Sequence, residues 1–275
     1  MRETIRVIET SLKNFYPLQE IRSLTFRILE SVCHIDGQFI LLGKDKQLST
    51  KEKTRIEEIL QNLKKYQPIQ YILGETEFYG LPFKLTNNVL IPRPETEELI
   101  EWINRSGNPL RVLDVGTGSG CIAVSIAKYN PEAMVSALDF SEDILEVAKQ
   151  NAELNDIKIN FIRMNILEEE PDGSWDVIVS NPPYIVPSEK TNMSANVLEY
   201  EPHSALFVPE DNPLLFYERI AEIGKNSLTP GGSLYFEINP LFADELKQLL
   251  QEKGYQGITI QKDISGKSRM IRGIL

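Results

Sequence analysis

Apolar side chains recur every three or four residues through the first 65 positions, which is the spacing of amphipathic helices. Three such stretches follow one another. Pro17 ends or follows the first, and Ser49 and Glu52 have capping-box spacing at the start of the third. We expect a small helical bundle that serves packing or partner binding, since nothing in it indicates chemistry. The stripes consist of Ile5, Ile8, Leu12 and Phe15, then Ile21, Leu24, Ile28 and Val32, then Ile56, Ile59, Leu60 and Leu63.

Strand-forming residues replace the helical pattern in residues 71–91. They are interrupted at Gly80-Leu81-Pro82 and at Asn87-Asn88, so we expect a hairpin-like connector. Residues 91–97 then predict a rigid start of a helix. Pro94 suits the first turn of that helix, and the acidic side chains after it suit the positive end of the helix dipole.

From residue 111 onward, short apolar strands alternate with helical stretches. This alternation is typical of an α/β fold with a mostly parallel sheet covered on both faces. We expect helices to begin near Gly118, Ser141, Asn212 and Leu241. The predicted strands are 111–115, 134–138, 157–162, 175–180 and 232–238, followed by an antiparallel edge pair, 258–261 and 270–274. The predicted organisation is a helical domain at 1–74, a hairpin connector at 75–92 and an α/β domain at 93–275.

The sequence Asn181-Pro182-Pro183-Tyr184 follows the predicted strand 175–180. The prolines lack backbone donors and end the strand, so Asn181 is held at its carboxyl end on a stiff backbone. In open α/β sheets, ligands bind at that edge. The amide oxygen of Asn181 and the main-chain carbonyls after it are acceptors that suit a flat NH2 group, whose face Tyr184 would cover. A strand-ending turn without a ligand is the alternative interpretation.

A glycine-rich turn, Gly116-Thr117-Gly118-Ser119-Gly120, follows the predicted strand 111–115. Glycines permit a tight turn and close ligand approach, although this spacing departs from the dinucleotide fingerprint. Asp139 ends the next predicted strand, and its two carboxylate oxygens fit a vicinal diol such as that of ribose. Asp114, just before the turn, either orders the loop or approaches the ligand.

Composition narrows the class of protein. Of 275 residues, 41% are hydrophobic and 25% are charged, as in soluble globular proteins. No apolar stretch reaches the length of a membrane span, and the start lacks the apolar core of a signal peptide. Cys33 and Cys121 are expected to be buried free thiols, which favours a reducing cytoplasm. With two histidines and no Cys-x-x-Cys pair, we predict no metal site.

The net charge of −11 argues against a broad nucleic-acid surface, which needs a basic footprint. The charge is uneven, because residues 1–74 carry 12 Lys and Arg against 9 Asp and Glu, whereas residues 75–275 carry 17 against 31. The first segment either meets an acidic partner surface or presents ordinary solvated helix faces.

Together, the glycine turn, Asp139 and the Asn-Pro-Pro-Tyr sequence resemble the class I S-adenosylmethionine-dependent methyltransferases that act on a planar amide or amine nitrogen. More narrowly, the chain is similar over nearly its whole length to the protein-(glutamine-N5) methyltransferases that modify peptide chain release factors. Residues 70–74, 89–97, 200–202 and 265–267 share in this resemblance, and Ile-Pro-Arg-Pro-Glu-Thr-Glu at 91–97 is its most specific part. The resemblance implies a Rossmann-like domain with a seven-stranded, mostly parallel sheet, joined by a β-hairpin to a helical substrate-recognition domain.

The resemblance also implies roles for single residues. Asn181 and the Pro182 carbonyl would accept hydrogen bonds from the substrate amide as the catalytic pair, with Asn181 also bordering the cofactor and with Pro183 and Tyr184 completing the slot. Asp139 would hold the ribose hydroxyls. Two residues, Asn165 and Ile166, would contact the adenine, where the family often has an Asp. The methionine part of S-adenosylmethionine would be lined by Gly116, Thr117, Gly118, Ser119 and Gly120.

The implied reaction is methyl transfer to the side-chain amide of the Gln in the Gly-Gly-Gln motif of bacterial class 1 release factors, with S-adenosylhomocysteine as the product. We expect a cytoplasmic monomer whose partners are release factors. We expect no stable nucleic-acid partner and no membrane association. Two alternatives stay open: the same chemistry on a ribosomal-protein Gln, and adenine-N6 methylation of nucleic acid, against which the acidic catalytic half counts. A non-catalytic cofactor-binding protein agrees poorly with the presence of both motifs.

Several polar residues near these motifs have ambiguous roles. His203 is interpreted as a loop residue near the substrate mouth rather than as a base, and Glu201 lies beside the active-site loop. Arg93 either braces the connector or binds substrate, and the same two interpretations apply to Lys267 and Arg269 in the tail turn.

Overall fold

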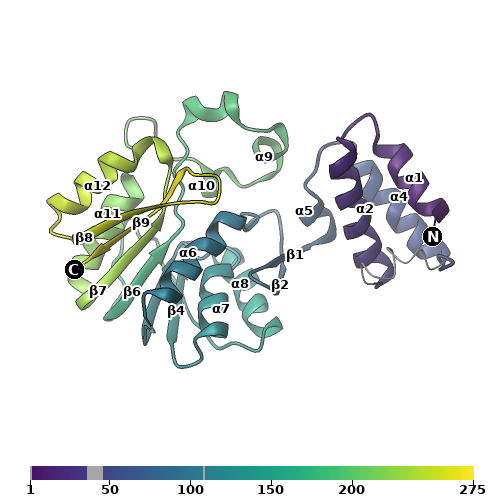
Figure 1. Ribbon diagram of the computed structural model, residues 1–275. Helices are drawn as coiled ribbons and strands as arrows, with labels where there is room; N and C mark the ends of the chain where they lie inside the picture. The colour runs from purple at the N-terminus through teal and green to yellow at the C-terminus, as the bar shows by residue number, and fades with distance from the viewer. Residues whose placement is uncertain (1, 36–45, 108) are drawn as a thin grey trace. The chain divides into compact units, whose positions relative to one another are not determined.

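The computed structural model describes residues 2–35, 46–107 and 109–275. The chain divides into two compact units (Figure 1). One comprises Met1–Gly74 with Ala195–Tyr200, and the other comprises Glu75–Ser194 with Glu201–Leu275. The short segment Ala195–Tyr200 therefore clusters with the first unit although it lies far along the chain.

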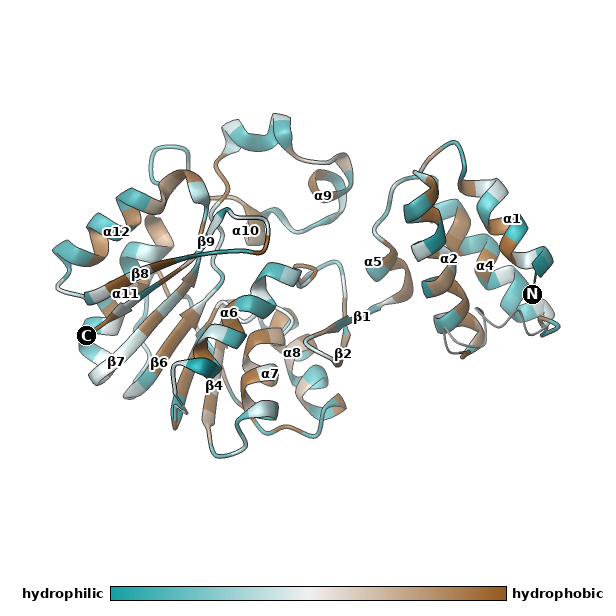
Figure 2. Ribbon diagram, in the orientation of Figure 1, coloured by the Kyte–Doolittle hydropathy of each residue, from teal (hydrophilic) through white to brown (hydrophobic). Residues whose placement is uncertain are grey.

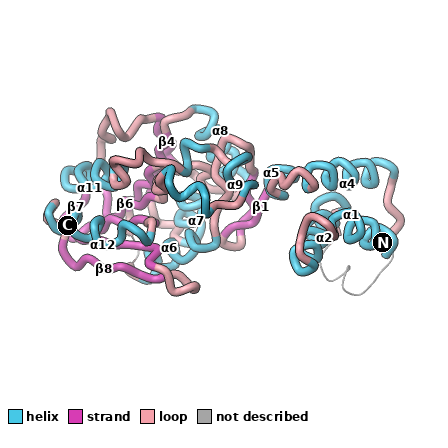
Figure 3. The backbone as a smooth tube through the Cα atoms, turned by 90° about the horizontal axis from the view of Figure 1, so that it is seen from above, coloured by secondary structure: helices cyan, strands magenta, loops and turns pink. Residues whose placement is uncertain are grey.

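The described residues of the first unit form only helices and loops (Figure 3). The predicted capping box is present, because the Ser49 hydroxyl accepts from Glu52 N and a Glu52 carboxylate oxygen accepts from Ser49 N. Tyr200 in the distant segment donates its hydroxyl to the Lys65 carbonyl at 2.9 Å. The apolar stripes meet in one core that includes Ile8, Leu12, Ile28, Leu29 and Ile59. The helices are α1 (Arg2–Leu12), α2 (Leu18–Cys33), α4 (Thr50–Leu63), α5 (Ile69–Leu73) and α9 (Ala195–Tyr200).

The second unit is built on a seven-stranded sheet with strand order β5-β4-β3-β6-β7-β9-β8. The five strands from β5 to β7 are parallel, and β9 runs antiparallel to both of its neighbours, which confirms the predicted edge pair. The strands are β3 (Arg111–Val115), β4 (Met134–Asp139), β5 (Asn160–Arg163), β6 (Trp175–Ser180), β7 (Leu228–Glu237), β8 (Gln256–Lys262) and β9 (Ser268–Ile274).

Two strands begin elsewhere than predicted. Strand β5 begins at Asn160 rather than at Ile157, because Ile157 N donates to the Ala152 carbonyl in the turn that closes the preceding helix. Strand β7 begins at Leu228, ahead of the predicted residue Gly232. A shift of register in its pairing with β6 lets the strand pass through Pro-Gly-Gly, which by sequence indicates a turn.

Helices cover both faces of the sheet (Figure 1). Neighbouring strand residues point to opposite faces, so Val112 packs with one set of helices and Leu113 with the other. Figure 2 shows the corresponding pattern of apolar strands and two-faced helices such as α12. The first set comprises α6 (Pro94–Arg105), α7 (Cys121–Tyr129) and α8 (Glu142–Leu154). The second set comprises α11 (Leu215–Ser227) and α12 (Ala243–Glu252). Short helical turns are η1 (Pro187–Asn192), α10 (His203–Leu206) and η2 (Pro240–Phe242).

A hairpin of β1 (Glu75–Phe78) and β2 (Leu81–Lys84) opens the second unit. Its two-residue turn is Tyr79-Gly80, where both residues have positive φ, as a type I′ turn requires. Asn151 of α8 ties the hairpin to the rest of the second unit, since it accepts from Lys84 N at 2.6 Å and donates to the Lys84 carbonyl. The strand-forming residues 89–91 are loop instead, and they lead into α6.

Candidate functional site

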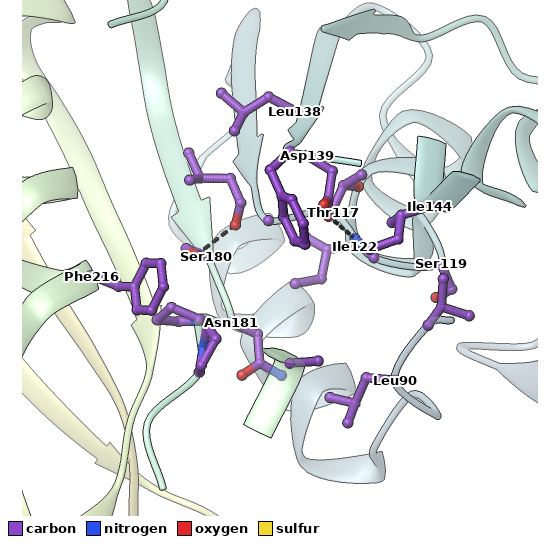
Figure 4. A pocket seen from close by; sticks show the side chains of 18 of the residues that line it. Leu90, Thr117, Ser119, Ile122, Leu138, Asp139, Ile144, Ser180, Asn181 and Phe216 are labelled. Carbon is purple, nitrogen blue, oxygen red and sulfur yellow. Dashed lines mark hydrogen bonds between the residues drawn. The ribbon is translucent and has the colours of Figure 1, made fainter. Parts of the chain in front are cut away.

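A pocket lies at the carboxyl edge of the parallel strands (Figure 4). Its walls come from the segments that follow β3, β4, β5 and β6, together with the segment before α6 and one side of α11. This is the edge at which open α/β sheets bind ligands. Most of the predicted site residues meet here: Gly116, Thr117, Gly118, Ser119, Asp139, Asn165, Ile166, Asn181, Pro182 and Pro183.

The glycine turn is held against β4 and leaves open space toward the pocket. Gly116 N and Thr117 N both donate to the Leu138 carbonyl, at 2.9 and 3.0 Å. Gly116 and Gly118 have φ of +72° and +56°, which L side chains rarely adopt, and a Cβ added at either would meet no atom within 4 Å. The turn therefore presents bare backbone to a ligand.

Gly120, predicted to contact the cofactor, lies outside the pocket lining. It caps the amino end of α7 with φ of +81°, and a Cβ at this position would lie 3.1 Å from the Ala148 Cβ. The structure gives this glycine a packing role, because it lets α7 and α8 approach closely.

Asp114 precedes the glycine turn in β3, and Asp139 ends the neighbouring strand β4. The two carboxylates have different surroundings. Asp139 lines the pocket, and its Oδ2 accepts from Gly118 N at 3.0 Å. Burial raises the pKa of Asp139, against the opposing effect of its backbone donors. Asp114 lies behind the turn, fully buried, and its Oδ2 accepts from the Thr117 hydroxyl at 2.6 Å. Burial raises the pKa of Asp114 to about 7, and its position favours loop ordering over ligand contact.

The predicted adenine residues follow β5. Asn165 uses its Oδ1 to accept from Leu167 N at 3.2 Å, so the turn fixes its side chain at the pocket wall. Ile166 is buried and offers an apolar surface to the same pocket. The sequence interpretation missed two aromatic walls, Phe140 and Phe216. Phe140 directly follows Asp139, which is a signal available in the sequence, whereas no motif marks Phe216 on α11.

Asn181 projects from the end of β6 into the pocket (Figure 4). The residue before it, Ser180, donates its hydroxyl to the Val115 carbonyl at 2.6 Å, which fixes the end of β6 against the start of the glycine turn. Asn181 Nδ2 donates to the Thr96 hydroxyl at 3.3 Å. The amide of Asn181 thus has its nitrogen engaged by α6, and its oxygen remains for a ligand.

Tyr184, predicted to cover the substrate amide, lies outside the pocket lining. Its hydroxyl donates to Glu237 Oε1 at 3.1 Å, and its ring packs with the core on the α11 side of the sheet. Burial raises the pKa of the Tyr184 hydroxyl, so the group stays a donor. In this structure the ring braces the chain below Pro183 instead of facing the pocket.

The polar residues whose roles are ambiguous in the sequence have distinct positions in the structure. Arg93 lines the pocket and pairs with the buried Glu201 at 2.7 Å. His203 is exposed, makes an edge-to-face contact with Phe207 and is not part of the lining. Arg269 donates to Asp263 at 3.1 Å and braces the β8–β9 turn.

The described parts of the chain show two further features. They contain no group of three or more His, Cys, Asp or Glu side chains arranged to hold a metal ion. None of their helices is long and apolar enough to cross a membrane. Both cysteines are buried and free, as predicted.

Known proteins resemble this chain in sequence and in fold. Residues 95–203 match the family model of the methyltransferase small domain, and residues 12–74 match that of the PrmC N-terminal domain. The release factor glutamine methyltransferase of Flavobacterium psychrophilum is 45% identical over 95% of this chain and 94% of its own length. The enzyme of the same name from Bacteroides thetaiotaomicron is 44% identical over 98% of this chain and 99% of its own length.

The solved structures extend the likeness to the backbone. A methyltransferase from Pyrococcus furiosus, 17% identical, superposes with a TM-score of 0.55 over 82% of this chain and 98% of its own, which shows a shared fold. The two relatives that align over nearly their full length identify the family. The pocket agrees with them, since it combines a glycine turn, Asp139 and Asn181. The chain belongs to the family of release factor glutamine methyltransferases.

Proposed function

We propose that this enzyme transfers a methyl group from S-adenosylmethionine to the side-chain amide nitrogen of the Gln in the Gly-Gly-Gln motif of bacterial class 1 release factors. The observation that carries the proposal is the position of Asn181, whose side chain enters the same pocket as the glycine turn and Asp139. An amide oxygen acceptor in this position suits a planar NH2 group. The names of the full-length relatives supply the substrate class.

The residues of the pocket fit the cofactor. Gly116 and Gly118 leave open space where a side chain would project, so the backbone admits the methionine part. Asp139 places a carboxylate at the end of β4 for the ribose hydroxyls, and Asn165, Ile166 and the exposed ring of Phe140 line the remaining wall for the adenine. When bound, S-adenosylmethionine supplies an electrophilic methyl group attached to a sulfonium.

The substrate amide is a poor nucleophile because its nitrogen lone pair is delocalised into its carbonyl. Asn181 Oδ1 and the Pro182 carbonyl can accept its two N–H groups, which orients the nitrogen and stabilises the positive charge that develops on it. Fixed orientation alone can contribute several kcal/mol to lowering a barrier, and preorganised dipoles add to this because they need no reorganisation. No strong base is required before transfer, since the methylated amide is acidic and releases a proton afterwards.

The helical unit is the proposed recognition module for the protein substrate. Its excess of positive charge complements an acidic partner surface, whereas the catalytic unit is strongly acidic. We further propose that the protein acts in the cytoplasm as a monomer, without a stable nucleic-acid partner. Salt-independent binding of the release factor would contradict the electrostatic part of this proposal.

Methyl transfer from labelled S-adenosylmethionine to a purified release factor tests the substrate. The controls are the same factor with its motif Gln replaced by Ala, ribosomal proteins, and adenine-containing DNA and RNA. We expect label only in the intact factor. Label in nucleic acid or in a ribosomal protein, with none in the release factor, would overturn the proposal.

A further inference from the structure

Three polar side chains from distant parts of the chain form a hydrogen-bonded row that leads from the pocket wall, at Asn181 and Thr96, to the buried Glu237. Asn181 Nδ2 donates to Thr96 Oγ1 at 3.3 Å, and Thr96 Oγ1 donates to Glu237 Oε2 at 2.6 Å. Thr96 lies in the first turn of α6 and is 2% exposed, and Glu237 ends β7 and is 1% exposed. The mechanism above uses neither Thr96 nor Glu237.

The chemistry of the row fixes the direction of its hydrogen bonds. An ionised carboxylate only accepts, so the single hydroxyl proton of Thr96 points to Glu237. The Thr96 oxygen then has only lone pairs to offer Asn181, and it can bind the amide nitrogen but not the amide oxygen. The amide of Asn181 is therefore turned with its nitrogen toward α6 and its oxygen toward the substrate.

Glu237 is itself held in place from several sides. Tyr184 donates its hydroxyl to Glu237 Oε1 at 3.1 Å, and the Tyr217 hydroxyl donates to the Glu237 main-chain carbonyl at 3.0 Å. Among nearby charges, Arg269 favours the ionised carboxylate and Glu95 opposes it. Burial is the largest effect and raises the pKa of Glu237. The carboxylate thus has two hydroxyl donors, one on each oxygen.

We propose that Thr96 and Glu237 are positioning residues, which set the orientation of the Asn181 amide so that its oxygen, and not its NH2 group, faces the methyl-accepting nitrogen. This inference rests on the proposed function, since it explains why the Asn181 amide oxygen, the acceptor that the substrate amide needs, faces the substrate. It also explains the place of Tyr184 outside the pocket, where it secures the carboxylate at the far end of the row.

The row predicts a dependence on pH. When Glu237 takes up a proton it becomes a donor, and Thr96 is free to donate to the Asn181 oxygen, which turns the NH2 group into the pocket. Because the active orientation needs the ionised form, turnover should fall as the pH drops through the raised pKa of Glu237. Tyr184, Tyr217, Arg269 and Glu95 surround the carboxylate and set where this occurs.

The test compares Thr96→Val and Glu237→Met, which nearly keep side-chain size and remove the directing hydroxyl and the accepting carboxylate, with Thr96→Ser, which restores a hydroxyl. Ser227→Ala is the control, because it removes a buried hydroxyl of α11 that donates only within its helix. Turnover, the Michaelis constant for release factor, S-adenosylmethionine affinity and the pH profile are measured for each. Thermal unfolding shows which variants are folded.

We expect Thr96→Val and Glu237→Met to lose about 100-fold in kcat with cofactor affinity unchanged, as misplaced catalytic groups do. Thr96→Ser should recover most of this loss, and the acidic limb of the pH profile should disappear in Glu237→Met. Folded Val and Met variants with kcat near that of Ser227→Ala would overturn the inference, as would an acidic limb unchanged in Glu237→Met. Wild-type enzyme that fails to label any release factor would instead refute the proposed function.

Discussion

The Nη2 atom of Arg93 lies 2.7 Å from both carboxylate oxygens of Glu201. The Glu201 side chain is 1% exposed and that of Arg93 is 31% exposed, so the guanidinium takes the place of solvent beside the buried acid. The pair joins the segment before α6 to the loop after β6, and both segments border the pocket.

Loss of Arg93 should therefore destabilise the catalytic unit. We expect Arg93→Met to lower the free energy of unfolding by about 1–3 kcal/mol, because a buried carboxylate is left without its partner. The control is Arg105→Met, whose partner Glu101 is well exposed and whose loss should cost less than about 0.5 kcal/mol. Equal urea midpoints for the two variants would show that the Arg93–Glu201 pair stabilises the protein no more than the exposed Arg105–Glu101 pair does.

The two glycines of the turn should respond differently to the same change. Gly118→Ala places a methyl group in open pocket space, so we expect weaker S-adenosylmethionine binding and a modest stability loss of about 1 kcal/mol from the positive φ. Gly120→Ala adds a contact of 3.1 Å with Ala148 to the same backbone penalty, so it should destabilise more and bind cofactor normally when folded. Calorimetric titration and thermal unfolding of both variants separate these effects, and the reverse order would be inconsistent with the structure.

Asp139 is expected to contribute charged hydrogen bonds to the cofactor. Removing them in Asp139→Ala should weaken binding of S-adenosylhomocysteine by about 10- to 100-fold, the effect of losing hydrogen bonds of 1.5–3 kcal/mol to a charged group. Part of the loss comes from the freed Gly118 N, which Asp139 now binds. A dissociation constant within about twofold of the wild type would remove Asp139 from the ribose site.

The buried acid behind the turn predicts a pH effect on stability. Burial raises the pKa of Asp114 from an ordinary value of 3.8 to about 7. The folded state therefore binds this proton more tightly than the unfolded state. The stabilisation that this bound proton gives the folded state is complete below about pH 4 and is lost as the pH rises through about 7.

Comparison with a neutral variant isolates that effect. Relative to Asp114→Asn, the wild type should lose up to about 4 kcal/mol of unfolding free energy between those pH values. Urea unfolding of both proteins across the range provides the measurement. Parallel curves would mean that Asp114 does not titrate as its burial requires.

Local signals in the sequence account for much of this fold. The alternation of short apolar runs with helical stretches located every strand of the sheet, and the proline pair placed Asn181 at a strand end. The glycine turn and Asp139 can be predicted because each lies at the carboxyl end of a strand that the sequence marks locally. Errors occurred where a local cue competed with tertiary pairing, as at Gly232 and Ile157, which are placed by a bulge and by a helix-closing turn.

The parts of the site that the sequence does not predict depend on contacts between distant residues. Thr96 and Glu237 are 141 positions apart, and Arg93 and Glu201 are 108 apart, so no spacing rule connects them. Tyr184 was assigned to the pocket because it follows Pro183, but its ring turns toward Glu237. Only the packing of β6, β7 and α6 shows which polar side chains meet.

The most direct test of the account is a single-turnover rate on release factor for wild type and Asn181→Ala, each saturated with S-adenosylmethionine whose binding is verified separately. Peptide mass spectrometry of the product identifies the modified residue. The account predicts methylation at the Gln of Gly-Gly-Gln by the wild type and a rate about 100- to 1,000-fold lower for the variant, the scale seen when a preorganised transition-state contact is removed. Equal rates for the two folded, cofactor-bound proteins would contradict the central role of Asn181.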